Sequence, residues 1–459
     1  MMGLMPSEET RTMTPPTVRS SAAHDAGKRG GASTRAWTMR LLVLGIVLSA
    51  LNLRPAITSL GALLEEVRDG LGMSGSVAGL LTSVPPLCFA VFGVMAPRLA
   101  RRLGAGAVVC AGMAAIATGL IVRPYAGGTA GFLAGSALAL MGIAVSNVLM
   151  PVIVKHWFPD RVGSMTGLYS MALALGTALA AAVTVPLTDT LGGSWQTGLA
   201  LWAGLAVAAV LPWLPFVRGR ATPPGAGEEA AEAETGGETP ARDRQAATRT
   251  QAPASTGHTR VETPRLRMAR SRTAWALAVF FGLQATAAYI TMGWMAQIFR
   301  DAGVPAGTAG LLLAVTMVMG VPLAFVIPRL ATRLPHQGPI VLALGVCGLA
   351  GYAGLYLAPA AGAWAWAVLL GVANCAFPLA LTMVGMRART GPGVARLSAF
   401  AQSTGYLISI PGPLLVGVLY QHSGGWGLPI ALMSALMIPQ MAVGFLAGRD
   451  RTVEDEAAR

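Results

Sequence analysis

The most regular feature of the chain is a series of long apolar stretches separated by short polar segments. A helix needs about 20 apolar residues to cross the hydrocarbon core of a bilayer. Twelve stretches approach or exceed that length, so the pattern predicts an all-α membrane protein with twelve transmembrane helices. Their expected bounds are 38–64, 75–96, 105–122, 129–154, 163–187, 197–217, 273–298, 304–327, 338–358, 362–385, 397–420 and 426–447.

The remaining segments divide the chain into domains. Residues 218–272 are rich in Ala, Glu, Gly, Thr, Pro and Arg, which predicts a disordered linker. The linker separates a six-helix half at 38–217 from a second six-helix half at 273–447. Residues 1–37 are expected to be a disordered tail, and residues 448–459 a second tail.

The composition excludes an ordinary soluble protein, because only 12% of the residues are charged, against about 25% in soluble domains. The net charge of +13 suggests nucleic acid, but the basic residues lie in short strips between apolar stretches. If the tails, the linker and every second loop share one side, that side holds 29 Lys and Arg residues. The other side holds only Arg68, Arg123 and Arg300. By the positive-inside rule, both termini and the linker are expected in the cytoplasm, and no nucleic-acid partner is expected.

The two halves carry related sequences. The tetrapeptide at 78–81 and the basic segment at 97–103 recur at 309–312 and 328–334, in both cases 231 residues later. Asn147 with Pro151 in the fourth span is matched by Asn374 with Pro378 in the tenth. These repeats predict two parallel-related halves.

No carboxylate lies inside an expected span, and Asp160, Asp189 and Asp301 are assigned to short loops. Arg54 is the one charged residue well inside an apolar stretch, where it costs about 2.5 to 3.5 kcal/mol on insertion scales. One interpretation is an anchor for an anionic or strongly dipolar substrate. The other is that Arg54 reaches the outer interface or binds carbonyl groups freed by Pro55.

Uncharged polar residues occur mainly in two spans of the second half. Their spacing puts Ser398, Gln402, Tyr406 and Ser409 on one face of the eleventh span, whereas those of the seventh span occupy more than one face. Such groups bind substrate or connect helices. The candidate substrate-binding residues are Arg54, Asn52, Asn147, Gln284, Tyr289, Asn374, Gln402 and Tyr406.

Two basic segments, at 97–104 and 328–337, are expected to be cytoplasmic loops. They act either as a gating latch that binds helix ends or as plain topology signals. Their arginines are Arg98, Arg101, Arg102, Arg329 and Arg333.

No enzyme signature is present. The four cysteines lie in apolar stretches without metal-ligand spacing, and no phosphate loop or catalytic motif occurs. We therefore expect no catalysis, no cofactor and no metal, and a monomer whose partners are the bilayer and a small solute.

Several strings resemble one branch of a known family. They are residues 51–59 (LNLRPAITS), 147–151 (NVLMP), 155–163 (KHWFPDRVG), 281–284 (FGLQ), 400–406 (FAQSTGY) and 412–417 (GPLLVG). Together they resemble the cyanate permease and 2-nitroimidazole transporter branch of the major facilitator superfamily, over about residues 38–447. The resemblance implies a bacterial inner-membrane permease for cyanate-like anions or nitroimidazole-type compounds.

The chain departs from the wider superfamily at two motifs. Pro97 and Ala100 replace an acid and a glycine of the cytoplasmic motif, and residues 175–180 (LGTALA) stand where drug/proton antiporters carry a glycine and proline motif. We expect a secondary active or facilitative transporter of a small anionic or polar planar solute that works by alternating access. The alternatives are export of nitroimidazole-type or other neutral drugs and, from another class, a non-transporting membrane sensor.

Overall fold

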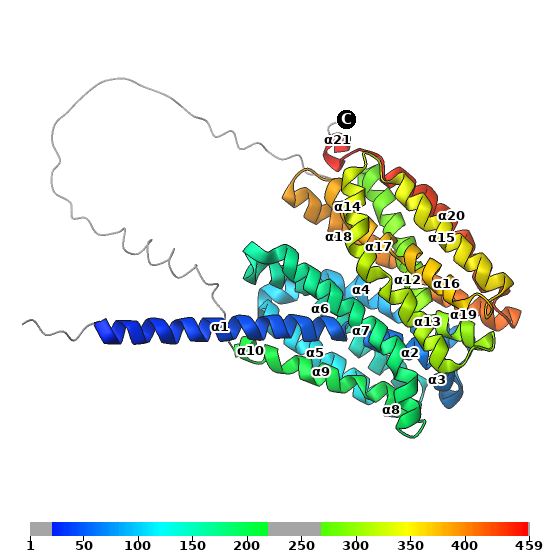
Figure 1. The fold of residues 1–459 in the computed structure, drawn as a ribbon, viewed down its shortest axis with the longest axis horizontal. Coiled ribbons are helices and arrows are strands. Elements are labelled where there is room, and N and C mark those ends of the chain that lie inside the picture. Colours follow the sequence, from blue (N-terminus) through cyan, green and yellow to red (C-terminus); the bar gives the residue numbers. More distant parts are fainter. Residues whose placement is uncertain (1–20, 219–267, 458–459) are drawn as a thin grey trace, which may run out of the picture. The chain divides into compact units, whose positions relative to one another are not determined.

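The computed structural model describes residues 21–218 and 268–457, and every regular element in these ranges is a helix. The chain divides into two compact units, residues 1–44 and 45–459, the second of which contains all the helices from residue 55 onward. Twelve helical segments of the described residues are long and apolar enough to cross a membrane, which confirms the twelve expected spans. Figure 1 shows α12 to α20 gathered in one bundle and α2 to α9 in another. Most of the expected linker, residues 219–267, lies outside the described residues.

The first half contains six of these spans. Its helices are α1 (Ser21–Asn52), α2 (Pro55–Ala62), α3 (Leu64–Leu71), α4 (Gly75–Leu103), α5 (Ala105–Val122), α6 (Thr129–Trp157), α7 (Val162–Thr190), α8 (Trp195–Ala200), α9 (Trp202–Val210) and α10 (Pro215–Arg218), with short 3-10 turns η1 (Arg123–Tyr125), η2 (Pro159–Arg161) and η3 (Leu211–Trp213).

The second half repeats the arrangement. Its helices are α12 (Arg272–Asp301), α13 (Ala306–Val318), α14 (Gly320–Arg333), α15 (Gly338–Leu357), α16 (Ala363–Asn374), α17 (Ala376–Met386), α18 (Gly391–Ser409), α19 (Pro411–Ser423), α20 (Gly427–Ala447) and α21 (Val453–Ala457), preceded by the turn η4 (Met268–Arg270).

Three boundary predictions are wrong. Residues 21–37, expected to be disordered, belong to helix α1, because no proline interrupts the chain between Pro16 and Pro55. Of the basic segments predicted as loops, residues 97–103 and 328–333 belong to the ends of α4 and α14, which continue through Pro97 and Pro328, while residues 104 and 334–337 do lie between helices. A proline near a helix end removes one hydrogen bond without ending the helix. Asp189 and Asp301 likewise lie in the last turns of α7 and α12.

Several spans are interrupted where the sequence pattern predicted continuous helices. The first span breaks at Leu53 and Arg54, and the eleventh at Ile410; the next helix begins with Pro55 or Pro411. Proline cannot donate the hydrogen bond that would continue the helix, but it is favourable as a first helical residue. Non-helical backbone at membrane depth is tolerated only where protein surrounds it or it lines a cavity.

Polar contacts join the two halves at one end of the bundle, which we call the Arg300 end. The guanidinium of Arg300 in α12 forms ion pairs of 2.9 Å with Glu65 and with Glu66 of α3. Nearby, the hydroxyl and the backbone N–H of Ser76 both donate to Oε1 of Gln421, over 2.7 and 2.9 Å. These bonds connect α3 and α4 of the first half to α12 and α19 of the second.

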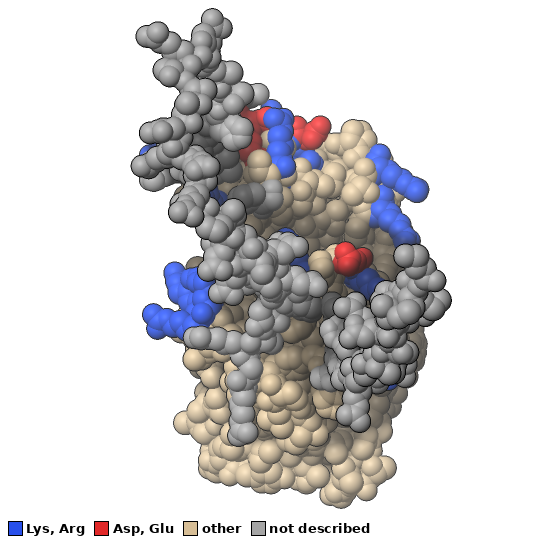
Figure 2. Space-filling view, turned by 90° about the vertical axis from the view of Figure 1, so that its left-hand side faces the viewer, with Lys and Arg blue, Asp and Glu red and all other residues tan. Residues whose placement is uncertain are grey.

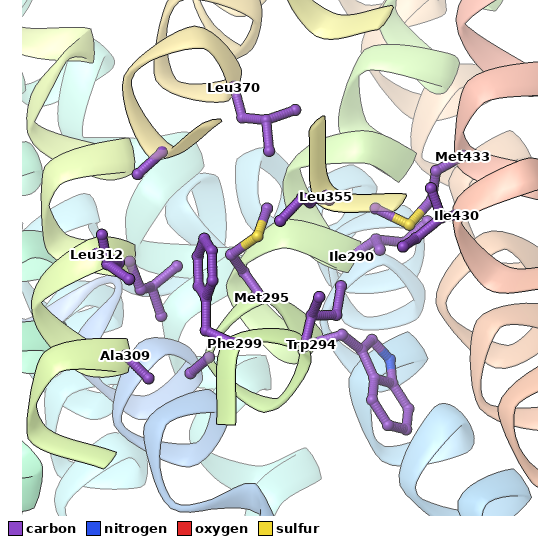
Figure 3. Close-up of a cluster of buried hydrophobic side chains, with 14 of the residues drawn as sticks. Ile290, Trp294, Met295, Phe299, Ala309, Leu312, Leu355, Leu370, Ile430 and Met433 are labelled. Atoms are coloured by element: carbon purple, nitrogen blue, oxygen red, sulfur yellow. The ribbon is translucent and has the colours of Figure 1, made fainter. Parts of the chain in front are cut away.

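Apolar packing continues this contact toward the middle of the bundle. A Cβ added to Gly79 in α4 would lie 2.8 Å from the carbonyl oxygen of Leu414 in α19, so only glycine allows this approach. The buried core of the second half, part of which is drawn in Figure 3, also includes Leu64, Ala78 and Ala181 of the first half. In Figure 3 the side chains of α12 lie between Leu312 of α13 and Ile430 of α20. The Arg300 end is therefore closed.

The opposite end, which we call the Arg98 end, carries most of the described basic residues. Figure 2 looks onto the left-hand side of Figure 1 and shows Lys and Arg side chains spread over this face. At this end the C-terminal segment forms helix α21, which packs against the starts of two other helices. Glu456 accepts hydrogen bonds from the hydroxyls of Ser271 and Thr273 at the start of α12, over 2.6 and 2.7 Å. Glu454 accepts from the backbone N–H of Arg389 before α18.

These bonds make the stability of the fold depend on pH. Burial alone would raise the pKa of Glu456, but hydrogen bonds from Ser271 and Thr273 outweigh burial and hold the pKa below its usual value. A lowered pKa in the folded state stabilises the protein above the unfolded-state pKa. That stabilisation is lost as the pH falls through the folded-state value.

We predict that Glu456→Gln lowers the Tm by a few degrees at neutral pH, since an acidic helix cap contributes about 1 kcal/mol. The variant should lose less stability than the wild type between neutral and strongly acidic pH. Thermal unfolding of the detergent-purified protein across this range measures both effects. Asp160→Asn at an exposed carboxylate is the matched control; equal acid sensitivity of all three proteins would contradict the capping role.

Candidate functional site

Arg54 lies at the break between α1 and α2, well inside the first candidate membrane span, Trp37–Ala62. Its carbonyl oxygen accepts hydrogen bonds from the backbone N–H groups of Ile57 and Thr58, over 2.9 and 3.1 Å, and so starts α2. Its side chain is partly buried, and the guanidinium carbon lies 6.0 Å from the ring centroid of Phe89 in α4. The break thus places a cation at membrane depth, and the carbonyl oxygen of the same residue already has its hydrogen-bond partners in α2.

Three tyrosines from three other helices surround this guanidinium. It interacts electrostatically with the hydroxyl groups of Tyr169 in α7, Tyr289 in α12 and Tyr406 in α18. The Tyr406 ring stacks on Phe89 with 5.0 Å between centroids. We call these five residues the Arg54 cluster. Since Tyr289 and Tyr406 belong to the second half, the cluster lies where the two halves meet.

The charge of Arg54 has no carboxylate partner among the described residues. The four ion pairs found there involve Arg300, Arg387 and Arg389, all at helix ends. Tyrosine hydroxyls and an aromatic face offset part of the charge, because a ring attracts a cation within about 6 Å. They leave the guanidinium able to bind an anion through its fork of N–H donors. This supports the anchor interpretation of Arg54; its carbonyl, not its guanidinium, makes the local backbone bonds.

Asn147 joins the cluster through a tyrosine, whereas Asn52 does not join it. The hydroxyl of Tyr169 donates to Oδ1 of Asn147 over 2.7 Å. Asn52 is buried, and its amide donates to the carbonyl oxygens of Leu48 and of Leu205 in α9. Asn52 therefore connects two helices of the first half.

Gln284 and Asn374 form a second polar group, inside the second half. The amide of Gln284 donates to the carbonyl oxygen of Asn374 over 3.0 Å, at the break between α16 and α17. Gln440 of α20 donates to Gln284 over 3.5 Å. The seventh span thus presents Gln284 to one neighbour and Tyr289 to another, as its spacing predicted. Nδ2 of Asn374 is buried without a partner among the described residues.

In α18, the predicted polar face is present. Nε2 of Gln402 donates to the hydroxyl of Ser398 over 2.7 Å, which fits their spacing of four residues. Tyr406, one turn further, is buried and reaches the Arg54 cluster, but the hydroxyl of Ser409 donates back to the carbonyl oxygen of Tyr406. Gln402 and Tyr406 therefore share a face on which only Tyr406 contacts the cluster.

The five arginines predicted for gating all lie at the Arg98 end with exposed side chains. None of them forms an ion pair or a side-chain hydrogen bond with another described residue. The latch interpretation therefore has no contact to support it in this conformation.

The sequence interpretation missed Phe89 and Tyr169. Both lie in spans whose apolar and small residues show no amphipathic face, and both are far in sequence from the polar residues of the second half. The signal that was available is the small number of tyrosines, seven in the chain. Within the described residues, no group of three His, Cys, Asp or Glu side chains could hold a metal ion.

Comparison with known proteins assigns this chain to a family. The model of the Major Facilitator Superfamily matches residues 42–388, about three quarters of the chain. The chain belongs to the major facilitator superfamily. Its fold is similar to that of a bacterial homologue of the human lysosomal transporter Spinster, with a TM-score of 0.67 and 14% identity, covering 90% of this chain and 96% of that one.

Three curated relatives are similar over nearly the whole chain. An uncharacterized transporter YycB of Bacillus subtilis is 35% identical, covering 90% of this chain and 94% of the relative. A 2-nitroimidazole transporter of Escherichia coli is 30% identical, over 90% and 96%. The cyanate transport protein CynX of the same species is 29% identical, over 88% and 96%. The expected branch of the superfamily is therefore confirmed, and the chain is a multi-pass membrane protein.

We predict that Arg54→Met does not lower the Tm of the purified protein and raises it slightly. Removing a cation that has no carboxylate partner removes a desolvation cost without leaving another charge unpaired. Arg387→Met is the contrasting variant, because the guanidinium of Arg387 donates to the carbonyl oxygens of Ala447 and Gly448. Thermal unfolding in detergent without added substrate compares the two. A drop of several degrees for Arg54→Met would show that Arg54 serves the helix break.

Proposed function

We propose that this protein is a secondary active or facilitative transporter that moves a small anionic, cyanate-like solute by alternating access. The observation that carries the proposal is the Arg54 guanidinium, placed at membrane depth between the two halves with no carboxylate partner among the described residues. Membrane arginines are costly, face protein interiors or water-filled spaces, and mark substrate pathways. The relative named for cyanate transport supports the same substrate class.

The position of the Arg54 cluster explains how binding could couple to transport. Arg54, Phe89 and Tyr169 belong to the first half, and Tyr289 and Tyr406 to the second. A solute held by Arg54 and by hydroxyls of the second half stabilises one arrangement of the halves over another. Only such differential binding shifts a conformational equilibrium. In the superfamily, solute sites lie near mid-membrane between the repeats.

We further propose that the Arg98 end faces the cytoplasm of a bacterial inner membrane, as the distribution of basic residues indicates. With this orientation, the structure is closed toward the outside, where Arg300 pairs with Glu65 and Glu66.

A second candidate is export of neutral planar compounds such as 2-nitroimidazole. The stacked rings of Phe89 and Tyr406 favour it, since a flat heterocycle stacks on such faces. A relative with this named substrate supports it as well. In this case binding would depend on the rings more than on the guanidinium.

We predict that Arg54→Gln reduces cyanate uptake into proteoliposomes at least tenfold, because the charge-assisted hydrogen bonds to the anion are lost. The substitution leaves 2-nitroimidazole flux within about twofold if the guanidinium is the anion anchor. Arg272→Gln, at an exposed arginine outside the cluster, is the matched control. Unchanged cyanate uptake by Arg54→Gln would overturn the anchor. Loss of 2-nitroimidazole flux in Phe89→Ala, with no cyanate uptake by the wild type, would favour the second candidate.

The closed Arg300 end gives a test of alternating access that does not depend on the substrate class. Ser76→Cys with Gln421→Cys should form a disulfide, because the side chains that they replace touch across the two halves. Oxidation should abolish the transport of any solute, and reduction should restore it. Each single variant, treated identically, controls for the native cysteines. Full transport by the oxidised double variant would contradict opening at this end.

A further inference from the structure

A second arginine, Arg123 in the turn η1, is almost completely buried, with 2% of its surface exposed. One of its amino groups, Nη1, donates to the carbonyl oxygen of Ala56 over 3.1 Å, and its guanidinium carbon lies 5.7 Å from the ring centroid of Phe132. Its Nε and Nη2 have no hydrogen-bond partner among the described residues. No ion pair found in the described residues includes Arg123, so its charge is buried and unpaired.

Arg123 lines a partly enclosed cavity of about 10 Å³. The hydroxyl of Ser136 in α6 lines the same cavity, is buried and also lacks a partner in the described residues. The hydroxyl of Thr82 in α4 is already used: it donates to the carbonyl oxygen of Gly79 and accepts from Nε1 of Trp294. The remaining walls are apolar, apart from backbone. The cavity therefore offers a positive charge and up to three free donors, and no carboxylate.

We propose that this cavity binds one small monatomic anion, which in the cell is chloride. An unpaired buried charge is strongly unfavourable, and an anion beside Nε, Nη2 and the Ser136 hydroxyl would compensate it. A water molecule could accept from these donors but would leave the charge unbalanced. The cavity is small, which favours a single-atom ion over an extended anion such as a carboxylate.

The site belongs to one arrangement of the two halves. Gly293 of α12 completes the cavity wall, while the other lining residues come from the first half. A Cβ on Gly293 would lie 2.7 Å from the methyl carbon of Thr82, so α12 packs directly against α4 here. Separation of the halves at the Arg300 end would open the cavity. Bound chloride thus stabilises the closed end and favours this state of the protein.

The test replaces gluconate by chloride at constant ionic strength and follows the Tm of the detergent-purified full-length protein. A ligand that binds only the folded state raises the Tm with saturation. We expect a rise of a few degrees for the wild type and for the exposed-arginine control Arg272→Gln. Arg123→Met should lose the response. Arg54→Met should keep it, which separates this site from the Arg54 cluster and from the fate of the transport proposal.

Two further measurements test the proposal even if Arg123→Met fails to fold. Ser136→Ala keeps the arginine and removes one donor, so the chloride concentration at half-maximal stabilisation should rise several-fold. Crystals grown in bromide should show an anomalous peak beside Nε of Arg123. A wild-type Tm that is insensitive to the exchange, an unchanged response in Arg123→Met or Ser136→Ala, or water alone in the cavity would each overturn the proposal.

Discussion

The structure depends on how the Arg54 guanidinium, which has no carboxylate partner among the described residues, is accommodated inside a membrane protein. Arg54 is placed there by Pro55, which ends one helix and begins the next. The break satisfies its own carbonyl groups, so the guanidinium is left for other partners. Those partners are the Phe89 ring and the hydroxyls of Tyr169, Tyr289 and Tyr406, which come from four helices of both halves. The aromatic ring and the hydroxyl groups lower the free-energy cost of burying the charge without neutralising it. The guanidinium therefore remains able to attract an anion.

The two halves are in contact at several levels between this cluster and the Arg300 end. Glycines let α4 approach α19 at backbone distance, and the ion pairs of Arg300 close the end where water competes for polar groups. Between these two levels lies the cavity of Arg123 and Ser136, which the second half completes with Gly293. Two unpaired arginines thus border the same contact between the halves, one partly buried and one enclosed.

The sequence was informative about the fold for a clear physical reason. The bilayer imposes a length and a composition on each span. The number of spans, the six-and-six division and the repeat could therefore be predicted without knowing any tertiary contact. Pro55 was visible, but the helix break beside it was not predicted, because a proline can also lie inside a continuous helix, as Pro97 does in α4. Asn52 shows the limit for site residues: it has the same polarity as Asn147, yet only its packing against α9 shows that it connects helices. Phe89 and Tyr169 were missed because an aromatic residue in an apolar span has no pattern of its own.

By itself, the sequence determined that the chain crosses a membrane twelve times as two related halves, and that Arg54 is the one charge well inside a span. Hydrophobic length and charge distribution are local properties, and no contact needs to be known to read them. Tertiary structure alone decided which residues surround Arg54, which end of the bundle is closed, and that Arg123, counted with the surface arginines, is enclosed with Ser136. These are outcomes of packing between residues far apart in the chain. Whether a polar group binds a solute or a neighbouring helix depends on what packing leaves unpaired.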